Sequence, residues 1–302
     1  MNVKIQTYNK REMINIKNER KIYMSKVWFI TGSSRGFGRS LAEAVLKHGD
    51  KLVATARKPK QLADLVECYR ENICTIELDV TNPEQAKAAI DFAIKTFGRI
   101  DVVVNNAGYS NIAAIEETSF EDFYAQIETN LWGVINVTKA ALPILHKQRS
   151  GHFIQFSSIG GRCCSPGLAP YQASKFAVEG FSEVLSKEIA PIGLKVTLIE
   201  PGGFRTDWGG SSMKVVEPGD DYKETVGSIL TYIRQNTGKE IGDPDKAALA
   251  IIKIVDEENP PLRLLLGSDA VNLANATDQA KLDETKRWAS LSISTDFDAI
   301  QQ

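Results

Sequence analysis

The chain has 302 residues, of which 43% are hydrophobic and 25% are charged, and its formal net charge at pH 7 is −2. These values are typical of a globular protein, and the nearly balanced charge argues against a nucleic-acid-binding or membrane-surface protein. No apolar run approaches the ~20 residues of a membrane span. The 4 cysteines have neither disulfide-scaffold nor zinc spacing, so we expect no metal site and a cytoplasmic location.

Residues 1–24 differ in character from the rest of the chain. They are rich in Lys, Arg, Asn and Glu, show no helical or strand periodicity, and lack the apolar core of a signal peptide. A second methionine, Met24, stands directly before the first predicted strand. We therefore expect a disordered N-terminal tail over residues 1–24, followed by a single domain over residues 25–302.

From Lys26 onward, short apolar runs alternate with segments of helical spacing. The runs are apolar almost throughout, as strands buried on both faces are: KVWFIT, KLVATA, ICTIEL, IDVVVN, HFIQFS, LKVTLIE and LRLLLG. Helical spacing occupies residues 36–48, 83–97, 119–147, 171–190 and 243–257. This alternation predicts an α/β fold with a doubly wound (Rossmann) parallel sheet of about seven strands. The irregular span 203–242, rich in Gly and Ser, is predicted to be a substrate loop.

The segment TGSSRGFG, after the first predicted strand, supports two incompatible interpretations. Residues 32–36 match G-x-S-x-G, the turn that carries the nucleophile of an α/β-hydrolase, but that triad needs a histidine late in the chain. The last histidine is His152, so we reject the hydrolase. Gly32, Gly36 and Gly38 instead form a glycine-rich turn between a strand and a helix. That context is typical of dinucleotide phosphate binding.

Five motifs follow one another in a family-specific order: TGSSRGFG, NNAG at 105–108, FSSIGG at 156–161, PYQASK and IEPGGFRTD. In this order and spacing the sequence resembles the short-chain dehydrogenase/reductase family, closely over about residues 26–205. Ser158 lies 13 residues before Tyr171 (171 − 158), and Asn130 lies 41 before it (171 − 130). The resemblance therefore implies a catalytic group of Asn130, Ser158, Tyr171 and Lys175.

These residue types suit hydride transfer between a nicotinamide and a carbonyl or secondary alcohol. The carbonyl oxygen gains negative charge and needs a proton, and tyrosine, with a free pKa of ~10, can supply it if its anion is stabilised. A lysine one helical turn away would lower that pKa, and the Ser158 hydroxyl can bind the developing oxyanion. The resemblance also implies that Lys175 binds the nicotinamide ribose and that Asn130 holds a proton-relaying water.

Cofactor contacts are expected in the glycine turn, at the ends of the second and third strands, in NNAG, on the Tyr–Lys helix and after the sixth strand. The predicted residues are Gly32, Ser34, Arg35, Gly36, Phe37, Gly38, Arg57, Asp79, Val80, Asn106, Ala107, Gly108, Tyr171, Lys175, Pro201, Gly202 and Thr206.

The charges near the second strand favour NADP(H) over NAD(H). An acidic residue about 20 positions after the glycines binds the adenosine ribose of NAD. Here Arg57 stands 19 positions after Gly38 (57 − 38), and no Asp or Glu occurs between Asp50 and Asp64. Arg57 and Arg35, with Lys58 as a third candidate, can bind a 2′-phosphate through charge-assisted hydrogen bonds.

The expected partner is a small hydrophobic or cyclic ketone or aldehyde, walled by Tyr109, residues 162–168 and the loop that contains Trp208. The resemblance also implies a homodimer or homotetramer, formed through helices 119–147 and 171–190.

Two alternatives stay open: an NADP-binding regulator that has lost turnover, and a structural or interaction protein. The complete Asn–Ser–Tyr–Lys set argues against the regulator. The extended sugar-nucleotide epimerases need a larger C-terminal substrate domain than this chain has room for.

Overall fold

The computed structural model describes residues 25–210 and 213–297, so the expected tail over residues 1–24 lies outside the described residues. The described chain contains a parallel sheet of seven strands in the order β3-β2-β1-β4-β5-β6-β7. The predicted doubly wound α/β fold is thereby confirmed. The strands are β1 (Val27–Ile30), β2 (Lys51–Ala56), β3 (Ile73–Glu77), β4 (Val102–Asn105), β5 (Gly151–Phe156), β6 (Leu194–Pro201) and β7 (Arg263–Leu266).

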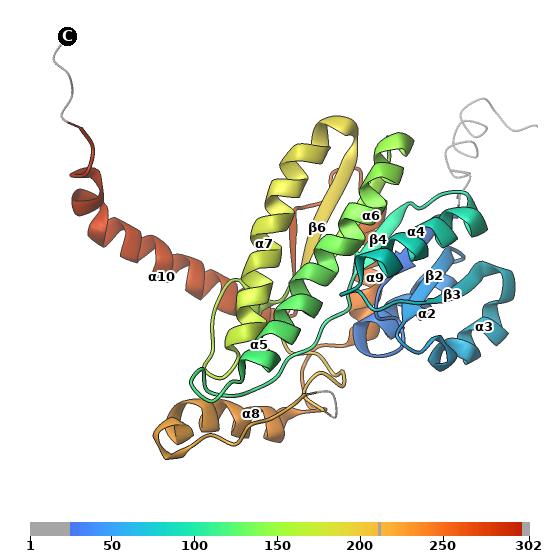
Figure 1. Ribbon diagram of the computed structural model, residues 1–302. Coiled ribbons are helices and arrows are strands. Elements are labelled where there is room, and N and C mark those ends of the chain that lie inside the picture. Colours follow the sequence, from blue (N-terminus) through green and yellow to red (C-terminus); the bar gives the residue numbers. More distant parts are fainter. Residues whose placement is uncertain (1–24, 211–212, 298–302) are drawn as a thin grey trace, which may run out of the picture.

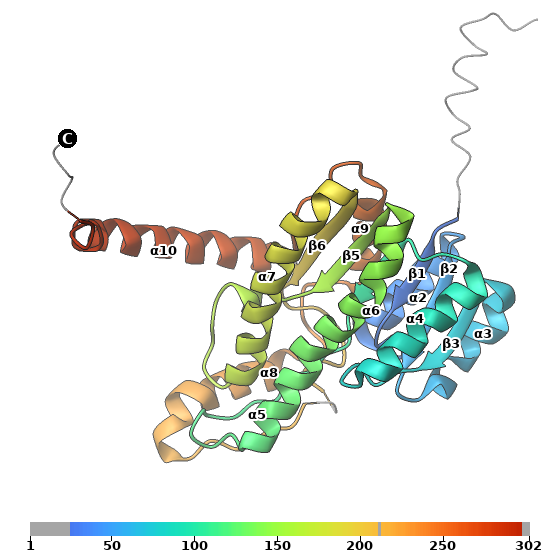
Figure 2. The same cartoon turned by 45° about the horizontal axis from the view of Figure 1, so that its top comes forward.

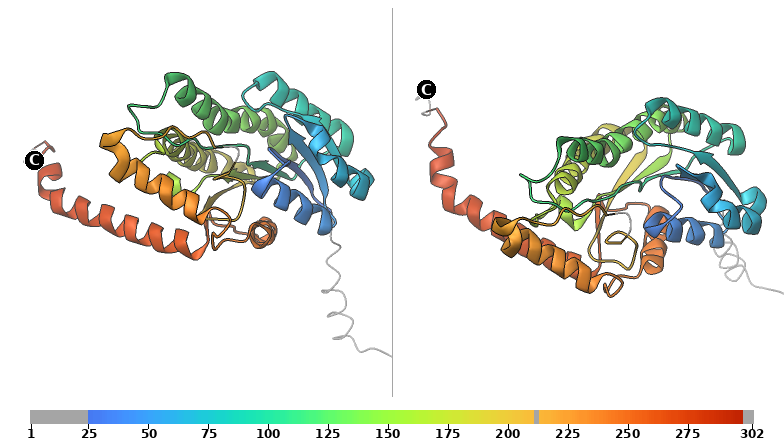
Figure 3. Two further views of the ribbon diagram at one scale, coloured as in Figure 1. Left: turned by 90° about the horizontal axis from the view of Figure 1, so that it is seen from below. Right: turned by 60° about the horizontal axis from the view of Figure 1, so that its bottom comes forward.

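Helices cover both faces of this sheet (Figure 1). Helices α4, α6 and α7 pack on one face, and α2, α3 and α9 pack on the other. Figure 3 shows the same layers from below. The helices are α2 (Gly36–Lys47), α3 (Ala63–Tyr69), α4 (Pro83–Phe97), α5 (Phe120–Ile127), α6 (Gly133–Gln148), α7 (Ala169–Ile189), α8 (Ser228–Asn236), α9 (Pro244–Asp256) and α10 (Ser268–Ile293).

The alternation of side chains along each strand builds two hydrophobic layers. On β1, Trp28 and Ile30 belong to the cluster beneath α2 and α9, whereas Phe29 belongs to the cluster beneath α4, α6 and α7. All three side chains are fully buried. Successive residues of a strand point to opposite faces, so a strand covered on both faces is predominantly apolar at every position. This is why the predicted strand runs show no polar alternation.

Helix starts follow the capping signals in the sequence. The Asn82 side chain accepts a hydrogen bond from the backbone N–H of Gln85 (2.9 Å), and Pro83 takes the first position of α4. Asp243 caps α9 in the same way, ahead of Pro244. Such caps satisfy N–H groups that have no partner within the helix.

Three segments differ from the simple expectation. The expected helix over 119–147 is interrupted by a π-helical turn, Glu128–Trp132, between α5 and α6. The span 203–242, expected to be irregular, contains α8. Helix α10, which the strand–helix rhythm did not predict, buries Ala270 and Ala274 near its start and then extends away from the domain (Figure 2).

Candidate functional site

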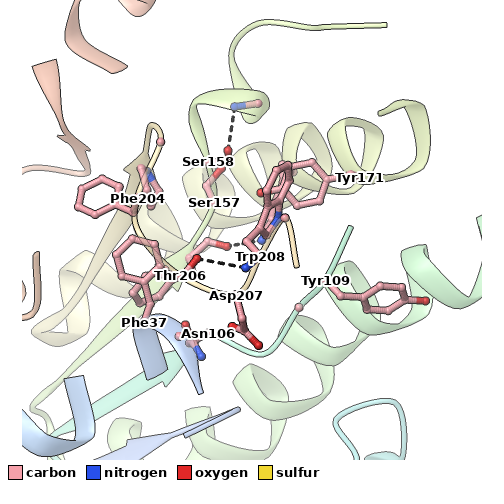
Figure 4. A pocket seen from close by; sticks show the side chains of 18 of the residues that line it. Phe37, Asn106, Tyr109, Ser157, Ser158, Tyr171, Phe204, Thr206, Asp207 and Trp208 are labelled. Carbon is pink, nitrogen blue, oxygen red and sulfur yellow. Dashed lines mark hydrogen bonds between the residues drawn. The ribbon is translucent and has the colours of Figure 1, made fainter. Parts of the chain in front are cut away.

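A cavity of about 1050 Å³ lies at the carboxyl ends of the central strands, where the sequence motifs meet (Figure 4). The strand order reverses between β1 and β4, and ligands of doubly wound sheets bind in the crevice at such a point. The predicted site residues line this cavity, apart from Gly38 and Asn130. The separate sequence motifs therefore contribute to one site.

The glycine turn after β1 has a backbone conformation that favours glycine at two positions. Gly32 has a φ of +68° and Gly36 a φ of +53°, both in the left-handed region. A Cβ atom on Gly38 would lie 2.2 Å from the carbonyl oxygen of Gly32 and 2.5 Å from Asn106 Nδ2. The Asn106 amide in turn donates to the carbonyl oxygens of Thr31 (2.9 Å) and Gly32 (3.2 Å). The Asn106 side chain of the NNAG motif thus holds the backbone of the glycine turn in place.

Helix α2 begins directly in this turn, at Gly36. Its first turn has no acidic residue, and the side chain of Arg35, at the N-cap position, makes no capping hydrogen bond. The N–H groups and the positive dipole end of a helix start attract anions. The turn and the helix start together therefore form a surface on which a phosphate fits.

Tyr171 and Lys175 lie one turn apart on α7, and both side chains are buried. The Nζ atom of Lys175 lies 5.6 Å from the centroid of the Tyr171 ring and donates a hydrogen bond to the carbonyl oxygen of Phe156 (2.7 Å). Burial lowers the pKa of Lys175 to about 8, and Glu179 opposes the shift. The lysine is thus still mainly cationic at neutral pH.

Ser158 follows β5 and faces Tyr171 (Figure 4). Its Oγ atom accepts a hydrogen bond from the backbone N–H of Gly160 (3.0 Å), which fixes the side chain. Burial raises the pKa of the Tyr171 hydroxyl, and a hydrogen bond with Ser158 lowers it in part. The lowering that we expected from Lys175 is absent from the protein alone, because desolvation of Tyr171 dominates.

Asn130 lies in the π-helical turn, fully buried below the cavity. Its Oδ1 atom accepts from the backbone N–H of Tyr109 (3.0 Å), and its Nδ2 atom donates to the Tyr109 carbonyl oxygen (2.9 Å). A Cβ atom on Gly108 would lie 3.0 Å from Asn130 Oδ1 and 3.8 Å from Lys175 Nζ. Asn130 and Lys175 therefore flank the same glycine, and π turns of this kind are frequent at functional sites.

The remaining predicted cofactor residues have distinct surroundings. The ring of Phe37 packs between Phe156 and Phe204, with centroid distances of 5.5 and 4.9 Å. Asp79 Oδ1 accepts two hydrogen bonds from Thr81, so this carboxylate also stabilises a turn. Arg57 is exposed at the end of β2. Phe37 gives the cavity an apolar wall, and Arg57 gives it a positive rim.

The substrate side contains residues that sequence reasoning missed. Trp208, which was expected, lies edge-on to Tyr171 at a centroid distance of 5.7 Å. Side chains from α8 and α10 complete the wall but were not predicted: Ile229, Tyr232, Ile233, Asn236 and Leu273. The spacing of Val226, Leu230 and Ile233 was a helical signal within the Gly- and Ser-rich span.

Residues 25–210 and 213–297 were also searched for metal-binding clusters and membrane-spanning helices. Among them, no three or more His, Cys, Asp or Glu side chains lie together in a way that could hold a metal ion. None of their helices is long and apolar enough to cross a membrane.

Comparison with known proteins identifies the family. The family model described as short chain dehydrogenase matches residues 26–215. The chain is 49% identical to oxidoreductase BOA17 of Botryotinia fuckeliana, over 90% of this chain and 100% of that protein. The structure resembles a short-chain dehydrogenase from Streptomyces avermitilis (TM-score 0.85, 38% identity, 91% of this chain and 100% of that one). It also resembles an NADP complex of a short-chain dehydrogenase from Burkholderia cenocepacia (TM-score 0.69, 26% identity, 87% and 97% of the two chains). The chain therefore belongs to the short-chain dehydrogenase/reductase family of oxidoreductases.

Proposed function

We propose that the protein transfers a hydride between NADP(H) and a hydrophobic ketone, aldehyde or secondary alcohol, with Tyr171 as the general acid and base. The observation that carries this proposal is the convergence of Ser158, Tyr171 and Lys175 in one cavity, with Asn130 directly below. A hydroxyl, a buried cation and a phenol around one space match the needs of a carbonyl that gains hydride on carbon and a proton on oxygen.

The bound nicotinamide supplies the hydride in reduction and accepts it in oxidation. In reduction, Tyr171 donates its proton to the carbonyl oxygen, and Ser158 binds the same oxygen as its charge grows. Burial raises the pKa of Tyr171 and so makes the phenol a weaker acid, which means that proton donation depends on stabilisation of the phenolate. Lys175, held by the Phe156 carbonyl, stabilises the phenolate that remains. Asn130 fixes the backbone of Tyr109 close to the lysine through two hydrogen bonds.

The residues of the turn fit a dinucleotide. A Cβ atom on Gly38 would lie only 2.2 Å from the Gly32 carbonyl oxygen, and one on Gly32 would lie 3.1 Å from Ala107 Cα, so the turn is tightly packed and its backbone is open to a close approach. The glycine turn and the start of α2 would hold the phosphates. Asp79, Val80 and the NNAG segment would hold the adenosine, and Pro201, Gly202 and Thr206 the carboxamide.

The charges around the adenosine end support NADP(H) over NAD(H). Arg57 lines the cavity at the end of β2, and Arg35 lines it from the turn. The first carboxylate after this strand, Asp64, forms an ion pair with Arg39, which neutralises it. A 2′-phosphate would thus meet the guanidinium of Arg57, with Arg35, which forms an ion pair with Asp207, as a second cation.

An oligomer remains part of the proposal. Phe176 and Val184 are exposed large apolar side chains on α7, at 39% and 56%, and Trp132 is exposed between α5 and α6. These helices are the ones through which the sequence predicts a dimer or tetramer. Exposed apolar side chains that share a face support such contacts.

The reaction is tested with Tyr171→Phe. We expect a fall in carbonyl reduction of about 10²–10⁴-fold, because the variant loses only the proton donor. The Kd for NADPH should stay close to that of the wild type. Tyr69→Phe, the same change on α3 outside the cavity, is the matched control. NADPH oxidation with a panel of aldehydes, quinones and cyclic ketones gives the rates, and substantial turnover by Tyr171→Phe would remove this residue from the mechanism.

The cofactor preference is tested with Arg57→Asp. A carboxylate would repel the 2′-phosphate and accept a hydrogen bond from a free ribose hydroxyl, so the preference should reverse. Wild-type protein should bind NADPH about 10²–10⁴-fold more tightly than NADH, since each hydrogen bond to a charged group contributes ~1.5–3 kcal/mol. Lys60→Asp, the same charge reversal outside the cavity, should leave the ratio nearly unchanged. Equal Kd values for NADH and NADPH in the wild type would disprove the preference.

A further inference from the structure

The segment after β6 lies over the glycine turn. A Cβ atom on Gly36 would lie 3.4 Å from Asp207 Oδ1 and 3.8 Å from the Cβ atom of Thr206. The Nη1 atom of Arg35 lies 3.3 Å from Asp207 Oδ2. Thus a carboxylate lies over the middle glycine of the turn and forms an ion pair with the arginine beside it.

A negative charge has a physical reason to be there. Helix α2 begins at Gly36 without an acidic residue in its first turn. The positive end of its dipole therefore lacks the carboxylate that many helices carry in their own sequence. Asp207 supplies one from a distant part of the chain. It does so in the space that a dinucleotide pyrophosphate would need in order to approach the turn.

The carboxylate is held by a short, ordered turn. The N–H of Gly210 donates to the Asp207 carbonyl oxygen (3.1 Å), and the N–H of Thr206 donates to the Phe204 carbonyl oxygen (2.8 Å). The N–H of Trp208 donates to Thr206 Oγ1 (3.3 Å). These hydrogen bonds hold the backbone on both sides of Asp207, so the side chain starts from a fixed position beside the turn.

We propose that Asp207 is a positioning residue that takes the place of a cofactor phosphate on the glycine turn and competes with the cofactor for Arg35. This inference rests on the proposed dinucleotide site. Two anions that share one turn repel each other, so the cofactor binds only as the carboxylate is pushed aside. Asp207 thereby weakens the affinity for every dinucleotide that carries a pyrophosphate, whether or not it has a 2′-phosphate.

The test is Asp207→Asn, which removes the charge and keeps the size of the side chain. We expect the Kd of NADH, measured by calorimetry, to fall about fivefold, the scale of an exposed ion pair, and the Kd of NADPH to fall by at least as much, because the released Arg35 is also proposed to bind the 2′-phosphate. The gain should shrink when the salt concentration rises from about 0.02 M to about 0.5 M, because salt screens exposed charges. Asp207→Glu keeps the charge and should show no gain.

Asp220→Asn is the matched control, the same change in the same segment on an exposed side chain outside the cavity. It should leave both Kd values unchanged. A higher Kd in Asp207→Asn would overturn the proposal, since Asp207 would then be orienting Arg35 for the cofactor. A gain confined to NADPH would overturn it too, because the competition would concern the 2′-phosphate alone. A wild-type protein that binds neither dinucleotide would instead refute the proposed function.

Discussion

The glycine turn and the segment 203–242 form opposite walls of one cavity, but they are built differently. In the turn, backbone and side-chain atoms approach so closely that a Cβ atom on Gly38 would lie 2.2 Å from the Gly32 carbonyl oxygen. Thr31 and Ser33, on either side of Gly32, are buried. In the segment 203–242, Tyr232 and Ile241 are exposed at 65%, and Leu230 packs in a small separate cluster.

The difference separates two kinds of specificity. A turn fixed by close backbone contacts tolerates a single residue type at several positions, so it presents one rigid surface to one class of ligand. A wall of apolar side chains from α8 and the loop before it accepts other residues of similar size. We infer that changes in the turn act on cofactor binding and folding together, whereas changes in the segment act on substrate choice.

The largest expected effect comes from Gly38→Ala. The added methyl group would meet Gly32 and Asn106 atoms that cannot withdraw without opening the turn, and overpacking of this kind costs about 1–3 kcal/mol. The Kd for NADPH, measured by calorimetry, should rise by about two orders of magnitude, and Tm should fall by several degrees.

Gly180→Ala is the matched control, because a Cβ atom there would meet no atom within 4 Å. This glycine lies inside α7, where alanine is favoured by about 1 kcal/mol, so stability should rise while the Kd stays unchanged. If Gly38→Ala bound NADPH like the wild type, the turn would be more adaptable than its packing indicates and the contrast between the two walls would fail.

Sequence reasoning succeeded for features that depend on the type and spacing of neighbouring residues. The apolar runs that predicted seven strands correspond to β1 through β7, because strands buried on both faces are predominantly apolar. The glycine spacing identified the turn, since a positive φ favours glycine at Gly32 and Gly36 and close contacts exclude a Cβ atom at Gly38. These signals are local and can be read without tertiary structure.

Sequence reasoning failed for features that depend on contacts between residues far apart in the chain. The ion pair between Arg35 and Asp207 joins residues 172 positions apart (207 − 35), and no local pattern marks it. The π-helical turn around Asn130 has no propensity signal that separates it from the flanking α-helices. The raised pKa of Tyr171 depends on burial that the Tyr–Lys spacing does not reveal.

The next largest effect is expected from Trp208→Ala. Trp208 lies edge-on to Tyr171, with an interplanar angle of 62°, and so limits the space beside the phenol. Its removal should raise the kcat/KM ratio of bulky to small ketones about tenfold, a change worth roughly 1.4 kcal/mol, while the Kd for NADPH stays within about twofold. Trp288→Ala, the same deletion on an exposed side chain of α10 outside the cavity, is the control. An unchanged ratio in Trp208→Ala would show that the segment does not set substrate choice.

The smallest effect concerns His152, at the far end of β5 from both walls. Burial lowers its pKa to about 3, and its Nε2 atom lies 3.0 Å from Thr197 Oγ1. Between pH 6.5 and 3 the unfolded chain binds a proton at this histidine that the folded chain does not, so the free energy of unfolding falls as the pH falls. Urea unfolding at two pH values would measure this contribution, which from about pH 7.5 to about pH 5.5 amounts to about 1.4 kcal/mol.

His152→Gln should remove that part of the pH dependence and leave the Kd for NADPH and the ketone preference unchanged. A variant with the full wild-type slope would place the pH-sensitive group elsewhere.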